Sequence, residues 1–577
     1  MRELSARFAG QADRSGPLAF GHAHILRAIL VDDDQTRDIL PMVFDIPDLP
    51  VERVIELVSV LLTRHESLRT RYRLTPPVTQ LVAGTGEQLV RIVEADEDPG
   101  AVAVRTAEQL RTPAFDFAAA PPLRVAVVTV ADVAKRLVWV VSHVAMDAAT
   151  CEILLREWTA LTEGRELPPT GTQPLDVVEL ERQPSVRRMG AAALRYWRTQ
   201  LERVPQAMLP IPARDAARST TWHPGVRVRS RVAMKQLAEV SARTGASGSM
   251  IVLAAIDALV CRHSGLAECV TTSLSGNRVP RALRGLFGTL SQDALLCVPV
   301  PGSGTFDELI GRVRSASLSA YRAAWYDVAQ IWSVIGEVTA ARGASYARDL
   351  VFNDMSQLSA GPDGEVVTRG AAARLPGVWV PGDVPLTVTD PELTASVQPQ
   401  DALNIPTRFM VYVYRLDTEL DVFLHVDPVC LDADQLAEFA RSLLRLLAQA
   451  ARRDVPLREL DSLSALAPMP HGPGWALVDG CWVEVSAVRA MVAEVLGELP
   501  HLVVLAPGRI TCFVAGPASP EDLHARCVAT LPGRVTALAP HEYVICADPP
   551  PDPSDEDSWA AREVVARGTG RGAEVAA

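Results

Sequence analysis

Lysine is almost missing from this chain, which has only Lys135 and Lys235 among 56 basic residues. Schiff-base chemistry would therefore have to use one of these two side chains. No G-x-x-x-x-G-K-[ST] loop is present, which excludes P-loop nucleotide chemistry. Nine cysteines occur without a C-x-x-C pair, and no H-x-x-x-H or H-E-x-x-H is found. These absences argue against zinc ribbons, dithiol redox motifs and metal-dependent catalysis, and we expect no metal site.

Positive charge and long apolar runs are also scarce. The formal net charge of −13 argues against binding to nucleic acid through bulk positive charge. The N-terminal segment lacks the apolar stretch of a secretory signal, and the longest apolar run, near Met250–Cys261, is too short to span a bilayer. We therefore expect a cytoplasmic protein without a membrane partner. A length of 577 residues predicts about four compact units.

One strand–turn–helix segment near the end of the first 175 residues carries candidate chemistry. The run at 136–141, RLVWVV, is apolar enough for a strand buried on both faces. It leads into Ser142, His143 and Asp147, and a helix is expected from about Ala148, with Asp147 as its N-cap. Two interpretations stay open on spacing alone. His143 is either an ordinary strand-end histidine or an imidazole held at a cleft as a base, with Asp147 fixing the turn through a buried arginine.

Several motifs resemble those of nonribosomal peptide synthetase condensation domains, in the same order along the chain. Arg64–Thr70 (RHESLRT) is similar to the family's RHExLRT motif, and Ser142–Ala148 is similar to its HHxxxDG motif. Further matching segments are PLAFGH at 17–22, YWRTQL at 196–201, SGNR at 275–278, GLFG at 285–288 and DLVFND at 349–354. The resemblance covers about residues 15–460.

The resemblance implies an α/β (α+β) fold with two chloramphenicol-acetyltransferase-like subdomains, 1–175 and 176–460, arranged in a V. His143 would lie in the tunnel between them and orient or deprotonate the acceptor. The donor would be a phosphopantetheine thioester on an acyl or peptidyl carrier protein, the acceptor a small molecule or carrier-bound group, and no cofactor is expected to be bound. Asp147 would pair with Arg278 or, as second choice, Arg64. Candidates for the substrate channel are Asn277, Gln292 and Asn353.

Two positions depart from the family pattern. Ser142 replaces the first histidine, and Ala148 replaces the glycine after the aspartate. The favoured function is amide formation with an amine acceptor in natural-product biosynthesis. Ester formation with a hydroxyl acceptor, and a catalytically silent module that docks carriers or recruits a tailoring enzyme, remain alternatives.

The remaining C-terminal sequence predicts a small αβ domain at 474–548 that weakly resembles the C-terminal subdomain of adenylation enzymes. It contains no lysine, and no large adenylation or carrier module is attached, so we expect a free-standing condensation enzyme without ATP-dependent activation. The domain would brace the second half or dock a carrier protein. The proline-rich and acidic residues 549–577 are expected to be a disordered tail. Arg227, Arg229 and Arg231 alternate along a predicted strand and would form a solvated basic face or a carrier-docking patch.

Overall fold

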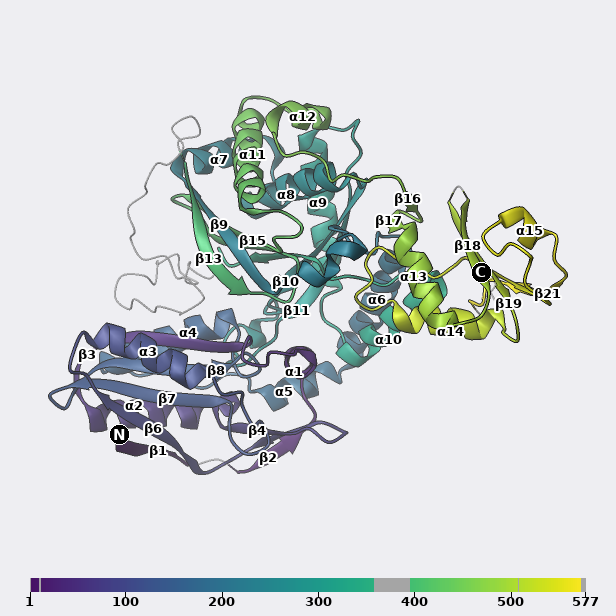
Figure 1. Cartoon of the computed structure of the whole chain (residues 1–577). Coiled ribbons are helices and arrows are strands. Elements are labelled where there is room, and N and C mark those ends of the chain that lie inside the picture. The colour runs from purple at the N-terminus through teal and green to yellow at the C-terminus, as the bar shows by residue number, and fades with distance from the viewer. Residues whose placement is uncertain (1, 10–11, 357–394, 507, 572–577) are drawn as a thin grey trace.

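The computed structural model describes residues 2–9, 12–356, 395–506 and 508–571. Figure 1 shows three units along the chain: an N-terminal half, a second half stacked against it, and a small unit beside the second half. Each unit is built around its own β-sheet and has its own apolar core.

The N-terminal half is a five-stranded sheet covered by helices on both faces. The strand order is β1-β6-β7-β8-β3. The bounds are β1 (Arg2–Phe8), β6 (Gly86–Glu94), β7 (Leu123–Val130), β8 (Val133–Ser142) and β3 (Ile39–Pro50). Helices α2 (Val51–Arg64) and α4 (Ala148–Thr162) pack on one face, and α3 (Pro99–Arg111) on the other. The apolar strand β8 is therefore buried on both faces, as its sequence predicts.

Smaller elements complete this half. A three-stranded sheet of order β2-β5-β4 contains β2 (Arg14–Gly16), β5 (Thr79–Val82) and β4 (Thr70–Arg73). Helix α1 (Phe20–Val31) leads toward the second half. The crossover between the halves runs through α5 (Pro174–Glu181) and α6 (Pro184–Leu201).

The second half is a seven-stranded sheet of order β11-β10-β12-β14-β15-β9-β13. Its strands are β9 (Trp222–Ser230), β10 (Glu268–Ser275), β11 (Gln292–Pro299), β12 (Leu350–Asp354), β13 (Ser396–Asn404), β14 (Phe409–Leu416) and β15 (Leu420–Val426). Helices α7 (Arg231–Thr244), α8 (Gly248–Ser264), α9 (Phe306–Arg322) and α11 (Ala433–Arg452) cover one face of this sheet (Figure 1). Helix α10 (Val328–Arg342) packs against α6. The opposite face of the sheet carries polar and aromatic side chains.

The arginines of β9 correct one expectation. Arg227 and Arg229 do not form a solvated face, because both are buried and bonded to carboxylates of β15 and the turn before it. Arg227 pairs with Asp421 at 2.6 Å, and Arg229 pairs with Glu419 at 2.7 Å. The alternation of the arginines shows that they share one face of the strand. The carboxylates that neutralise their charges belong to the neighbouring strand and its turn, which only the structure shows. Arg231 lies outside the strand, at the start of α7.

The two halves are joined by side chains as well as by the crossover. Asn404 at the end of β13 accepts from Arg37 Nη2 at 2.8 Å and donates to Asp34 at 2.7 Å. Glu181 at the end of α5 accepts from the Phe20 backbone N–H at 3.0 Å and from the Trp325 indole at 3.1 Å. Both contacts connect residues of α1 or the loop after it to the second half or the crossover.

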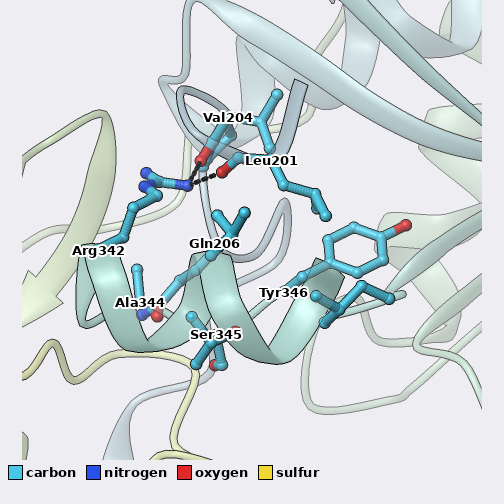
Figure 2. Close-up of a pocket in the computed structure, with 11 residues that line it drawn as sticks. Leu201, Val204, Gln206, Arg342, Ala344, Ser345 and Tyr346 are labelled. Carbon is cyan, nitrogen blue, oxygen red and sulfur yellow. Dashed lines mark hydrogen bonds between the residues drawn. The ribbon is translucent and has the colours of Figure 1, made fainter. Parts of the chain in front are cut away.

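The small C-terminal unit contains both helices and strands, as expected for an αβ domain. It contains β16 (Trp475–Val478), β17 (Cys481–Glu484), α13 (Val485–Leu496), β18 (His501–Ala506), β19 (Arg509–Ala515), α14 (Pro520–Thr530) and β20 (Glu542–Cys546). Gln206, after α6, donates to the Val535 carbonyl at 2.6 Å, and Trp482 donates to the Ser264 carbonyl at 2.8 Å. Figure 2 shows a small cavity at this junction, where Arg342 donates to the Leu201 and Val204 carbonyls. The unit is thus firmly attached to the second half.

The expected disordered tail is wrong for the residues that the structure describes. Residues 556–560 form α15 (Glu556–Ala560), and β21 (Val564–Gly568) pairs antiparallel with β20. Trp559 is fully buried against the core of the small unit. The proline-rich and acidic composition of this segment does not reveal its structure. One buried tryptophan and one short strand at the edge of the sheet are enough to hold it in place. The rest of the predicted tail, 572–577, lies outside the described residues.

No single helix among the described residues is both long and apolar enough to cross a membrane, and only α7 and α8, which are bent against each other, reach that length and apolar character when taken together. In the same part of the chain, no group of three or more histidine, cysteine, aspartate or glutamate side chains could hold a metal ion.

Candidate functional site

The segment between β8 and α4 brings the predicted site residues together. Strand β8 ends at Ser142, His143 follows it, and α4 begins at Ala148. Asp147 is the N-cap of α4, because its carboxylate accepts from the Thr150 backbone N–H at 2.9 Å. The cap fixes the direction in which the chain leaves the sheet, and so fixes where His143 stands.

Asp147 is saturated with hydrogen bonds. Arg278 Nη2 approaches its two carboxylate oxygens at 2.8 and 3.0 Å. The Thr150 hydroxyl donates to it at 2.8 Å and the Leu290 backbone N–H at 3.1 Å. Burial alone would raise the pKa of Asp147, but Arg278 and the surrounding donors hold this pKa below its usual value. Asp147 is thus a permanently charged structural residue, and Arg278 is its partner.

A loop of the second half inserts into the first half at this point. Phe287 packs within the core of the N-terminal half. Gly288 exchanges hydrogen bonds with the Thr150 hydroxyl, accepting at 2.8 Å and donating at 3.2 Å. A Cβ on Gly288 would lie 2.9 Å from Ser67 Oγ, and its φ of +152° disfavours other residues. This glycine therefore permits the close approach that lets Arg278 reach Asp147 across the interface.

The RHESLRT motif braces the same helix from the other side. Arg64 and His65 both bond Glu157 on α4, at 3.0 and 2.6 Å. The His65 ring stacks on Phe287 with centroids 4.0 Å apart. Arg64, the second choice as partner of Asp147, is therefore engaged with Glu157 instead. The motif is structural: it ties α2, α4 and the inserted loop together.

His143 lies at the edge of this hydrogen-bond network, and its side chain takes no part in it. The residue is half-buried, and its backbone N–H donates to the Asp38 carbonyl at 2.7 Å. Nδ1 is buried without a hydrogen-bond partner among the described residues, whereas Nε2 is not one of the buried polar atoms. An imidazole nitrogen with neither burial nor a partner is available to a ligand. Other chain elements hold the backbone of His143 in place and leave this nitrogen unused.

The three channel candidates occupy different environments. Asn277 Nδ2 donates to the Ala324 carbonyl at 2.9 Å and to the Leu290 carbonyl at 3.1 Å, and the residue has a φ of +49°. Gln292 is buried and donates to the Tyr326 carbonyl at 2.8 Å. Both amides thus bind the loops around the site rather than face open space. Asn353 is half-buried on β12, on the sheet face opposite the helices, in register with Tyr412 of β14.

The two departures from the family pattern lie in contrasting places. Ser142 is buried in the sheet, opposite Ile39 of β3, and its hydroxyl lies 3.4 Å from the Val144 backbone N–H. Ala148 is exposed at the first position of α4. The extra methyl group of Ala148 therefore displaces no packed neighbour. Ser142 thus lies inside the sheet, one residue before the turn that carries His143.

Several residues around the site escaped the sequence analysis. Thr150, Glu157 and Leu290 act through contacts between distant segments, and a single sequence carries no signal for them. The same is true of Arg348, which pairs with Asp293 at 2.7 and 2.9 Å near His24. His22 lies beside the Asp147–Arg278 pair, and burial lowers the pKa of its ring to about 4, so it is neutral there.

Comparisons with known proteins identify the family. A family model described as Condensation domain matches residues 31–360, more than half of the chain. Bacitracin synthase 2 from Bacillus licheniformis is 24% identical over 429 residues, which is 73% of this chain and 16% of that protein. Phosphinothricin tripeptide synthetase PhsC from Streptomyces viridochromogenes is 27% identical over 292 residues, 47% of this chain and 26% of that protein. The chain spans about a sixth to a quarter of the length of these relatives.

Solved structures agree on the fold. The condensation domain of the Monacolin K polyketide synthase MokA matches with a TM-score of 0.60 at 18% identity, covering 77% of this chain and 98% of that one. The X-domain from teicoplanin biosynthesis matches with a TM-score of 0.57 at 21% identity, covering 78% and 97%. The predicted α/β fold of two chloramphenicol-acetyltransferase-like halves is thereby confirmed. This chain belongs to the condensation domain family.

Proposed function

We propose that this protein transfers an acyl or aminoacyl group from a carrier-protein phosphopantetheine thioester to an amine, forming an amide. One observation carries the proposal: His143 Nε2 is not buried and bonds none of the described residues, while the loop that holds it is fixed by the saturated Asp147–Arg278 pair. Family membership supports the reaction class and an acyl or peptidyl carrier protein as partner.

The chemistry follows from the position of one accessible imidazole nitrogen. The acceptor nitrogen attacks the thioester carbonyl carbon, a C–N bond forms, and the C–S bond to phosphopantetheine breaks. His143 Nε2 takes the proton that the attacking nitrogen loses and returns it to the leaving thiolate. Thioester aminolysis is already downhill, so positioning supplies much of the acceleration and proton transfer adds about 10²-fold.

The test loads carrier proteins with a panel of acyl groups and offers amine and alcohol acceptors to the wild-type protein and to His143→Ala. Intact-protein mass reports loss of the acyl group, and small-molecule mass reports the product. We expect acceptor-dependent amide formation that falls by about 10²-fold in His143→Ala. His501→Ala, a half-buried histidine of the small unit, is the matched control and should transfer normally.

The other outcomes separate the remaining functions. Transfer to alcohols alone would indicate an ester-forming enzyme that uses the same histidine. Carrier binding without transfer across the panel, unchanged in His143→Ala, would indicate a docking module. A docking module is included among the outcomes because Ser142 stands where the family has its first histidine.

A further inference from the structure

Asp38 is the residue directly opposite His143 across the sheet. Strand β3 pairs with β8 so that Ile39 faces Ser142, and the next pair outward is Asp38 and His143. The 2.7 Å hydrogen bond from the His143 N–H to the Asp38 carbonyl continues this register beyond the two strands. Directly opposite residues of an antiparallel pair project to the same face with Cβ atoms about 4.5–5.5 Å apart. The carboxyl group of Asp38 therefore emerges beside the imidazole.

The Asp38 carboxyl group has no counter-ion of its own among the residues that the structure describes. Within the described ranges it makes no side-chain hydrogen bond and no ion pair within 4.0 Å, with His143 or any other residue. The neighbouring cations are already engaged: Arg37 pairs with Asp32 and bonds Asn404, and Arg348 pairs with Asp293. Within the described part of the chain, a half-buried carboxylate is thus left beside His143 without a partner.

The charges around the Asp38 carboxyl group do not fully compensate for its burial. Burial raises the pKa of Asp38 above its usual value, and Asp32 adds to the rise, although His143, Arg37 and Arg348 act in the opposite direction. Tyr412 of β14 is close enough for Asp38 to contribute to its raised pKa of about 12, of which burial is the larger cause. A cation placed between Asp38 and His143 would offset the desolvation of the carboxylate.

We propose that Asp38 binds the protonated amine of the acceptor and holds its nitrogen beside His143 Nε2, which makes the site selective for amines over alcohols. This inference rests on the proposed transfer reaction and names its acceptor class. The separation of the two side chains supports it. They are more than 4.0 Å apart and do not bond each other, yet a nitrogen that bonds both spans roughly 4.5–5 Å, because its two hydrogen bonds diverge at about the tetrahedral angle.

The proton balance assigns each group a role. His143 Nε2 accepts one proton from the ammonium bound to Asp38 and releases it to solvent, which leaves a neutral amine. The amine nitrogen then attacks the thioester carbonyl carbon, and Nε2 takes a second proton as the C–N bond forms. That proton goes to the phosphopantetheine thiolate as the C–S bond breaks. Asp38 touches the acceptor and stays ionised throughout.

Asp38→Asn tests this role, because it removes the charge and keeps the size of the side chain and the backbone bond to His143. Acceptors are supplied in pairs of equal skeleton, such as 2-phenylethylamine with 2-phenylethanol and propylamine with propanol. We expect KM for the amines to rise about tenfold or more, while KM for the alcohols stays within about twofold. Asp38→Glu should restore part of the amine preference. Asp33→Asn, an exposed aspartate of the same loop, is the matched control and should change neither KM.

A binding measurement without any donor separates this inference from the transfer reaction. Ligand-observed NMR compares each amine with its alcohol on the wild-type protein and on Asp38→Asn. Tighter binding of the amine that disappears in Asp38→Asn supports the site even if no acyl transfer occurs. Equal binding of amine and alcohol by the wild-type protein in every pair overturns it. His143-dependent transfer in which Asp38→Asn slows both acceptors equally also overturns it and leaves the proposed transfer intact.

Discussion

Two aspartates flank His143, and the structure treats them in opposite ways. Asp147 meets Arg278, two backbone N–H groups and a hydroxyl, and these donors hold its pKa below the usual value although the residue is buried. Asp38, opposite His143, meets no donor within the described residues, and burial raises its pKa. A buried carboxylate with all its donors fixes the fold, whereas one without donors is prepared for a ligand. Structure and ligand binding are thus divided between two aspartates on separate loops, Asp147 just before α4 and Asp38 just before β3.

The largest effect on stability is expected at Asp147, whose carboxylate has all its hydrogen-bond donors. Arg278→Met removes the cation and leaves the Asp147 charge buried, which should lower the free energy of unfolding by about 3–5 kcal/mol. Urea denaturation measures this change. Arg281→Met, at an exposed arginine three residues along, should stay within about 0.5 kcal/mol of wild type. If both variants unfold at the same urea concentration, Asp147 does not depend on Arg278.

Glu181 is the intermediate case, since among the described residues it accepts from two N–H donors and pairs with no cation. Burial raises its pKa to about 7, so the protonated form is favoured in the folded protein. The stability that this group contributes is present below about pH 4.5 and is lost as the pH rises through 7. Glu181→Gln should remove this loss, gaining about 1–3 kcal/mol on wild type between pH 5 and 8.

Denaturation curves at several pH values measure that gain. Glu179→Gln on the same helix, where the side chain is exposed, is the control and should follow the wild-type pH profile. A constant difference between Glu181→Gln and wild type at every pH would contradict the assignment of the pH dependence to Glu181.

The smallest effect is expected at Ala148, the position where the family has glycine. The side chain is exposed, so Ala148→Gly should change stability by less than about 1 kcal/mol, the usual cost of glycine in a helix. The rate of acyl transfer should stay within about threefold of wild type. A large gain in rate would mean that the methyl group narrows the acceptor path after all.

The sequence by itself determined the local elements and the order of the motifs. The apolar run of β8, the capping Asp147 and the start of α4 are local features, and each appears where the sequence predicts it. The RHESLRT and HxxxD motifs were sufficient to indicate the family and its two-half fold. Local propensity and spacing depend on only a few neighbouring residues, so they can be predicted from a single sequence.

Only the tertiary structure decided which partners meet. Sequence offered Arg278 and Arg64 for Asp147, and the insertion of the loop around Gly288 brought Arg278 there and left Arg64 with Glu157. Asp38 acquired its place from strand register, because a shift of one residue would have put another side chain opposite His143. Long-range pairing depends on the packing of whole sheets, and this packing selected which charges neutralise each other, as it did for Asp147 and Arg278.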